Sequence, residues 1–260
     1  MKNTKLNAII LKDLKAITSN KRMFSVMLIV PFVMVIFLPS IFILTTYFEP
    51  ASVSDFGALL GEFGDGQDIN RMVISLILNN IMPIFFMIIP LMVSSVMAAS
   101  SFVGEKEKRT LETLLYSPLA LKQIFRAKIL ASSLMSMLVS VCSFVVMVIV
   151  TQIEIVLTTG SLLLPDISWL VVMLLLSPSV SLIAITIIVR GSANAKTTEE
   201  AQQRSGLLVL PVILLIVGQF TGLLLVNIWM LLVLSILFAV LALFLMNSSF
   251  RKLDYETILK

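Results

Sequence analysis

Residues 72–100 read MVISLILNNIMPIFFMIIPLMVSSVMAAS, and the charged string GEKEKRTLETLLYSPLALKQ (104–123) follows almost at once. The first stretch contains no Asp, Glu, Lys or Arg. An α-helix rises about 1.5 Å per residue, so about 20 apolar residues cross a hydrocarbon core of roughly 30 Å. The sequence therefore predicts a membrane-spanning helix that leads directly into a charged segment.

The rest of the chain is equally apolar. Of its 260 residues, 58% are hydrophobic and 13% are charged, against roughly 25% charged in soluble domains. The mean hydropathy is +1.06. We expect an all-α integral membrane protein with six spans, namely Met23–Thr46, Met72–Ser100, Ile129–Val150, Ser168–Val189, Leu207–Val226 and Ile228–Met246.

Three regions are expected along the chain. Residues 1–22 form an amphipathic interfacial helix, with Leu6, Ile9, Ile10 and Leu14 on one face and Lys5, Lys12 and Lys15 around the other. This helix is either an anchor or a lever that moves with the first span. Residues 23–248 form the six-span domain, and residues 249–260 form a C-terminal tail.

The positive charges predict the orientation. If the spans alternate, all but one of the 19 Lys and Arg residues fall on one face, and Arg71 is the exception. Positive charges near span ends are retained on the cytoplasmic side. We therefore expect both termini in the cytoplasm. Membrane insertion explains this basic face, so we expect no nucleic-acid partner.

The charged string is expected to be helical up to Ser117-Pro118, because proline disfavours helical geometry before it. Leu111, Leu114 and Leu115 then share one face, and Glu105 can pair with Arg109, four residues on. A second amphipathic piece follows, with Leu121, Ile124 and Phe125 on its apolar side. The prediction is a helix, a break and a helix on the cytoplasmic surface.

The run SFVGEKEKRTLETLLYSPLALKQIFRAK (101–128) resembles the signature of the ABC-2 type permease family, the membrane subunits of a class of ATP-binding-cassette exporters. The shared pattern is an acidic and basic cluster, Thr-Leu-Glu, two leucines, and Ser-Pro before the next span. The resemblance implies a coupling helix that docks into an ATPase subunit. The docking residues would be Glu105, Glu107, Arg109, Thr110, Leu111, Glu112, Leu114, Leu115 and Pro118.

The resemblance also implies two permease protomers, identical or different, working with two ATPase subunits in a bacterial-type plasma membrane. The sequence has no Gly-x-x-x-x-Gly-Lys-Ser/Thr motif, so ATP and Mg would bind the partner and this chain would be no enzyme. Many relatives have a re-entrant excursion between the fifth and sixth spans. Residues 206–248 are almost all needed for the two membrane crossings, so they leave little chain for such an excursion.

Three amides at span depth are candidates for a translocation pathway: Asn79 and Asn80 in the second span and Gln219 in the fifth. Amides in hydrocarbon need partners, so they can equally pack helices together. Prolines within the spans, including Pro83 and Pro178, are expected to kink helices or release carbonyls.

The substrate class stays open among peptides or bacteriocins, lipids, drugs and sodium ions. One rival function is an ion-coupled secondary carrier, which the absence of ionisable residues from the predicted spans disfavours. Another is a membrane scaffold or immunity protein, which needs no ATPase. The sequence has no His and a single cysteine, Cys142, so no metal site is expected.

Overall fold

The computed structural model describes residues 2–48, 66–110, 120–192, 195, 197–221 and 228–251. Within these ranges 90% of the residues are helical and none is in a strand. Among them, six helices are long and apolar enough to cross a membrane: Met23–Phe48, Arg71–Glu107, Leu121–Thr159, Ser168–Gly191, Thr198–Phe220 and Ile228–Ser249. The expected all-α fold with six spans is confirmed.

The first three spans comprise α2, a helical run from α4 to α6, and α8. Their bounds, with those of the first helix, are α1 Lys2–Ser19, α2 Lys21–Phe48, α4 Gly66–Leu76, η1 Ile77–Ile81, α5 Met82–Phe86, α6 Ile88–Glu107 and α8 Leu121–Thr159. The remaining elements are α9 Ser168–Val171, η2 Val172–Leu176, α10 Ser177–Gly191, α11 Thr198–Gly206, α12 Val209–Phe220 and α13 Ile228–Arg251.

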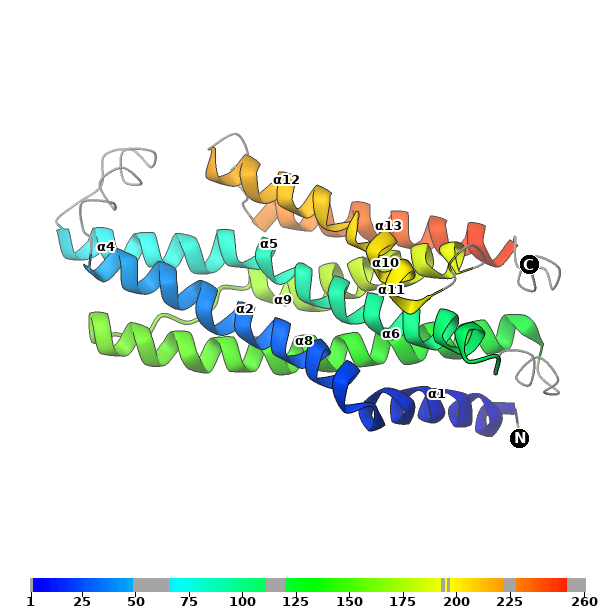
Figure 1. Cartoon of the computed structure of the whole chain (residues 1–260). Coiled ribbons are helices and arrows are strands. Elements are labelled where there is room, and N and C mark those ends of the chain that lie inside the picture. The colour runs from blue at the N-terminus through cyan, green and yellow to red at the C-terminus, as the bar shows by residue number, and fades with distance from the viewer. Residues whose placement is uncertain are drawn as a thin grey trace.

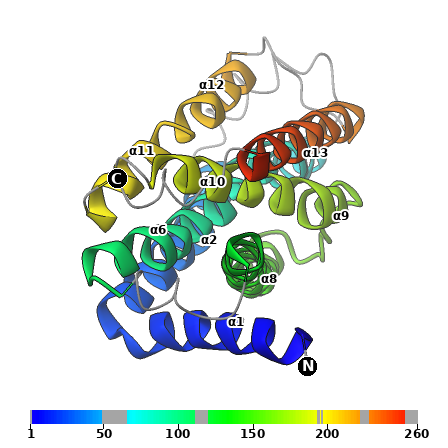
Figure 2. The ribbon, with the colours of Figure 1, turned by 90° about the vertical axis from the view of Figure 1, so that its right-hand side faces the viewer.

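The long helices run roughly along one axis, and α1 crosses beneath α8 at one end (Figures 1 and 2). The second and fourth spans are mostly buried, whereas few residues of the fifth and sixth spans are buried. Helix α1 begins and α13 ends at the same end of the bundle (Figure 1). The assignment of that end to the cytoplasm stays a prediction from the positive charges.

Two wide π-helical turns, η1 and η2, interrupt the second and fourth spans, and a proline follows each. Pro83 and Pro178 lack an N–H group, and their rings crowd the carbonyl four residues earlier. The chain widens instead: Met82 N–H bonds to Ile77 O, and Ser177 N–H bonds to Val172 O. Each of these two prolines therefore follows a local widening of its helix.

One released carbonyl has a partner from another span. Leu78 O would bond to residue 83 in a π pattern, but that residue is proline. The indole N–H of Trp169 donates to Leu78 O across 3.2 Å instead, and Trp169 is buried. Buried carbonyls need such partners, so this bond fastens the fourth span to the second.

The predicted surface helix at residue 104 does not begin there. Residues 104–107 are the last turn of α6, and α8 already begins at Leu121, so both charged flanks extend span helices. The chain turns at Lys108 and Arg109, and Glu105 pairs with Lys12 and Lys128, not with Arg109. The predicted break at Ser117-Pro118 lies outside the described residues.

Helix α8 also extends beyond its predicted end. It stops at Thr159, where Gly160 adopts φ 67° and its N–H bonds to Val156 O across 3.0 Å. Glu154, four residues beyond the predicted end of the third span, therefore lies in a helix, where one of its carboxylate oxygens accepts a hydrogen bond from Ser40 Oγ at 2.5 Å. A helix of this length rises about 58 Å at about 1.5 Å per residue, so it must project beyond the hydrocarbon core.

The fifth span is also displaced from its prediction. It is built from α11 and α12, starts at Thr198, and has a turn at Leu207 and Leu208. Helix α12 ends at Phe220, whose ring stacks 6.1 Å from that of Phe42. Residues 222–227, where a re-entrant excursion could begin, lie outside the described residues.

The predicted N-terminal helix is present as α1, but its apolar face packs against other helices of the protein. Ile9 packs with Ile124 and Ala127 of α8, and Leu6 and Ile10 border this cluster. Burial of an apolar face against other helices is the main stabilising term for such a segment. The predicted apolar face of α1 therefore contacts protein.

Candidate functional site

A buried lysine lies where α1, α6 and α8 meet. Lys128 of α8 is 1% exposed, and its ammonium donates to Glu105 Oε2 at 2.7 Å and to the carbonyl of Ser101. Asp13 Oδ2 lies 3.9 Å away, and the ammonium is 5.3 Å from the centre of the Phe102 ring. A buried charge is stable only when it is paired in this way.

Glu105 completes the pairing with both of its carboxylate oxygens. Oε2 accepts from Lys128, and Oε1 accepts from Lys12 of α1 at 2.5 Å. Glu105 is 8% exposed, whereas the Lys12 side chain is 52% exposed. One carboxylate of α6 therefore connects a buried cation on α8 with a surface cation on α1.

Asp13 adds a second carboxylate from α1. It is 5% exposed and accepts a hydrogen bond from Ser101 Oγ at 2.6 Å. Burial raises the pKa of the Asp13 carboxyl above its ordinary 3.8, and Lys128 and the Ser101 hydrogen bond offset part of that rise. We call Lys12, Asp13, Ser101, Glu105 and Lys128 the ionic cluster; its two lysines and two carboxylates balance.

The sequence carries a signal for this cluster in the positions of two charged residues. Asp13 falls on the apolar face of α1 with Ile9, Ile10 and Ile17, at three- and four-residue spacing. Lys128 falls on the same face of α8 as Leu121 and Ile124. A charge on an apolar face predicts a buried partner, and here two such charges belong to one cluster.

The last turn of α6 is closed by a defined backbone motif. Arg109 N–H bonds to Lys106 O at 3.0 Å, and Thr110 N–H bonds to Glu105 O at 2.9 Å. These two bonds form a Schellman motif, whose turning residue is left-handed and usually glycine. Arg109 has φ 55°, a conformation that costs a non-glycine residue about 1–2 kcal/mol.

Helix α11 is fastened to the same turn of α6. The Glu107 carboxylate accepts from the backbone N–H of Thr198, at the start of α11, across 3.2 Å. A carboxylate at a helix N-terminus is favoured by the helix dipole. A Cβ added at Gly104 would lie 3.4 Å from Thr198 Cγ2, so the end of α6 and the start of α11 are near neighbours.

A cavity of about 190 Å³ opens between α1 and the end of α6. Its charged and polar lining includes Lys12, Asp13, Asn20, Glu105 and Lys108. The apolar part of the lining comes from Ala16, Ile17 and Met23. The ionic cluster therefore forms one wall of a cavity, and that wall is polar.

The predicted docking residues divide into three groups. Glu105 is buried, and Glu107 contacts α11, so both already have partners in this chain. Arg109 and Thr110 are exposed at the turn. The others, Leu111, Glu112, Leu114, Leu115 and Pro118, lie outside the described residues.

The predicted pathway amides lie in two places. Both ends of the Asn79 amide in η1 have hydrogen-bond partners: Oδ1 accepts from Asp166 N–H at 2.9 Å, and Nδ2 donates to Ser75 Oγ at 3.4 Å. Asn80, beside it, is partly buried. Gln219 lies in α12, where its buried Oε1 has no hydrogen-bond partner among the described residues. A role of these amides in translocation stays a prediction.

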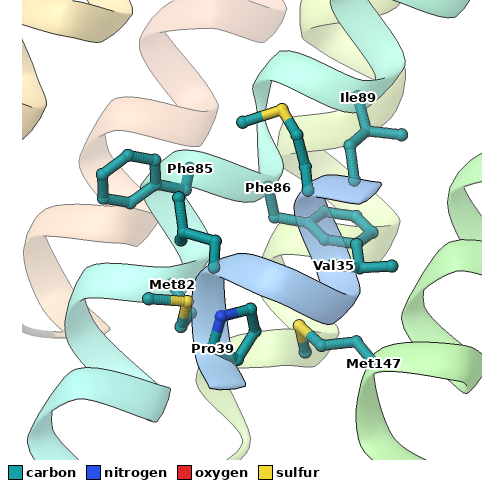
Figure 3. Close-up of a pocket in the computed structure, with 9 residues that line it drawn as sticks. Val35, Pro39, Met82, Phe85, Phe86, Ile89 and Met147 are labelled. Carbon is teal, nitrogen blue, oxygen red and sulfur yellow. The ribbon is translucent and has the colours of Figure 1, made fainter. Parts of the chain in front are cut away.

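The helices around η1 are closely packed. A space of about 10 Å³ lies between α2, α5, α6 and α8, with Pro39, Phe86 and Met147 among its lining residues (Figure 3). This volume is about that of one water-sized probe. Flexible methionines such as Met82 and Met147 can repack, so this apolar contact can change shape.

No curated protein and no solved structure matches the chain. The family model described as ABC-2 family transporter protein matches residues 7–226, which include most of α1, the ionic cluster, the turn at Arg109 and five of the spans. The match covers most of the 260 residues. The chain therefore belongs to the ABC-2 transporter family.

Proposed function

We propose that this membrane permease is one subunit of an ATP-driven exporter and that a separate ATPase subunit docks on the segment following α6. The proposal rests on the contacts that attach the end of α6 to three other helices. Its last two turns contact α1 and α8 through Glu105, and α11 through Glu107. A load applied just beyond Thr110 would therefore reach four helices.

The proposed docking surface follows from which side chains are already engaged. Glu105 is buried in the ionic cluster, and the exposed Glu107 accepts a hydrogen bond from the start of α11. Arg109 and Thr110 are exposed, and they lead into the segment that resembles the family signature. The surface would comprise these two residues with Leu111, Glu112, Leu114, Leu115 and Pro118.

The coupling mechanism is a rigid-body displacement. Closure of the ATPase subunits would push the segment beyond Thr110, and the ionic cluster would carry α1 with α6 and α8. Buried, paired groups resist separation, so the three helices would shift as one body. ATP and Mg would act on the partner, and this chain would convert the motion into opening of a path.

A second permease protomer, identical or different, would complete that path. Helices α12 and α13 support this part of the proposal because many of their apolar side chains are exposed, for example Leu214 and Trp229. Lipid and a second protomer can both cover such a surface. Export of a peptide, lipid, drug or sodium ion across a bacterial-type plasma membrane remains the proposed substrate range.

The test is co-purification with a candidate ATPase and measurement of ATP hydrolysis in the reconstituted complex. We expect the wild-type permease to bind the ATPase and raise its rate. Glu112→Lys should abolish both effects while insertion stays normal, and Lys122→Gln, an exposed charge change on α8, should abolish neither. A scaffold protein predicts no binding and no stimulation.

A further inference from the structure

The cavity beside the ionic cluster has the chemistry of an anion site at a membrane boundary. We propose that it binds the phosphate of an anionic glycerophospholipid, between the ammonium groups of Lys108 and Lys12. This inference goes beyond the proposed export function and holds whether or not an ATPase binds the chain.

The position of the cavity favours a lipid. Met23 lines it and is the first residue of the first candidate span. Gly104, Glu105 and Lys108 line the other side, where the second candidate span ends at Glu107. A cavity between the start of one span and the end of the next lies at the level of lipid headgroups.

The charges favour an anion. The two carboxylates in the lining are engaged: Glu105 by Lys12 and Lys128, and Asp13 by Ser101. Lys108 is exposed and forms no ion pair with a described carboxylate. The lining together with Lys128 has three lysines against two carboxylates, which leaves one positive charge for one phosphate.

The apolar surface beside the cavity offers a place for an acyl chain. Met23 begins the apolar stretch of α2, and Val26, Ile29, Val33 and Phe37 then follow at three- or four-residue spacing. All four are largely exposed and form a stripe along α2 that leads away from the cavity. A lipid with its phosphate in the cavity could lay an acyl chain along this stripe, whereas free phosphate could not use it.

The experiment measures lipid binding to the full-length permease alone, by native mass spectrometry from detergent with graded phosphatidylglycerol. We expect Lys108→Gln to weaken phosphatidylglycerol binding about tenfold, the effect of losing one charge-assisted hydrogen bond. Lys122→Gln removes the same charge from the exposed start of α8, outside the cavity lining, and should change binding less than about twofold.

A second variant tests the cavity without changing charge. Ala16→Trp places a large side chain in the lining and should reduce phosphatidylglycerol binding as strongly as Lys108→Gln. Equal binding by wild type, Lys108→Gln and Ala16→Trp would overturn the site.

Two comparison ligands identify the source of the phosphate. Phosphatidylcholine, whose headgroup is neutral overall, should bind at least about tenfold more weakly than phosphatidylglycerol. Inorganic phosphate alone should not compete at similar concentrations, because it cannot use the apolar stripe on α2. Phosphatidylcholine binding of equal strength would overturn the anion preference, and competition by phosphate would overturn the lipid assignment.

Discussion

Lys128 and Glu105 form a buried ion pair 2.7 Å long between the third and second spans. Lys12 and Asp13 of the N-terminal helix contact this pair. Glu105 itself lies five residues before Thr110, where the proposed docking segment begins. The pair and its partners therefore join α1, which precedes the first span, to the end of the second span and the start of the third.

The first prediction concerns Lys128. Lys128→Met leaves two carboxylates with only Lys12 beside them, and removal of one partner from a buried pair typically costs about 3–5 kcal/mol. We expect a large fall in the apparent melting temperature of the purified chain in detergent. Lys122→Met, at an exposed position on the same helix, should change stability by less than about 0.5 kcal/mol. Similar melting of the two variants would contradict the ionic cluster.

The second prediction concerns pH. Because burial raises the pKa of Asp13, the folded chain keeps its proton at pH values where the unfolded chain has lost it. The free energy of unfolding therefore falls as pH rises from 3.8, the ordinary pKa, to the raised pKa of the folded chain. Above the raised pKa, Asp13 is ionised in both states and its contribution changes no further. Asp13→Asn should be more stable relative to wild type at pH 7 than at pH 4. A difference in melting temperature that is constant, or larger at pH 4, would be the opposite result.

The third prediction concerns the turn after α6. Arg109 pays the steric cost of a left-handed conformation, which glycine adopts freely. Arg109→Gly should therefore stabilise the chain by about 0.5–1 kcal/mol, and Arg109→Val should destabilise it, because a β-branched residue fits this conformation poorly. Chemical unfolding in mild detergent measures both changes. A stabilising valine would show that residue 109 is not left-handed.

The fourth prediction concerns α11. With Cys142 replaced by serine, a Gly104→Cys, Thr198→Cys pair should cross-link readily, since a Cβ at residue 104 lies 3.4 Å from Thr198 Cγ2. Gly104→Cys with Arg204→Cys, nearly two turns further along α11, should not cross-link. If α6 and α11 move as one body, the cross-link should leave stimulation of the ATPase unchanged. A loss that a reductant reverses would show that the two helices must separate.

The sequence predicts the six spans well, because about 20 uncharged apolar residues in a row are enough to identify a crossing. It predicts their ends poorly. The sequence predicts Glu105 and Lys128 in a helix, break and helix element on the cytoplasmic surface, but each is buried in a span helix because the other neutralises it. Hydropathy counts each charge separately, so it cannot recognise a pair whose members are far apart along the chain.

For the prolines and the docking residues, too, the sequence does not predict contacts between residues that are far apart along the chain. A proline in a span predicts a disturbed helix, and both Pro83 and Pro178 follow π turns. The sequence does not say which group donates to the released carbonyl, because Trp169 is remote from Leu78 along the chain. Likewise, the family signature identifies Glu105, Glu107 and Arg109 together, and three-dimensional contacts separate the engaged acids from the exposed arginine.

The central proposal is that a separate ATPase drives this permease through the segment beyond Thr110. The most direct measurement is the ATP hydrolysis rate of the purified ATPase, titrated with the permease in nanodiscs. The proposal predicts saturable stimulation by wild type and by Lys122→Gln, and none by Glu112→Lys. Uphill solute transport by the permease alone, in liposomes without any nucleotide-hydrolysing protein, would contradict it.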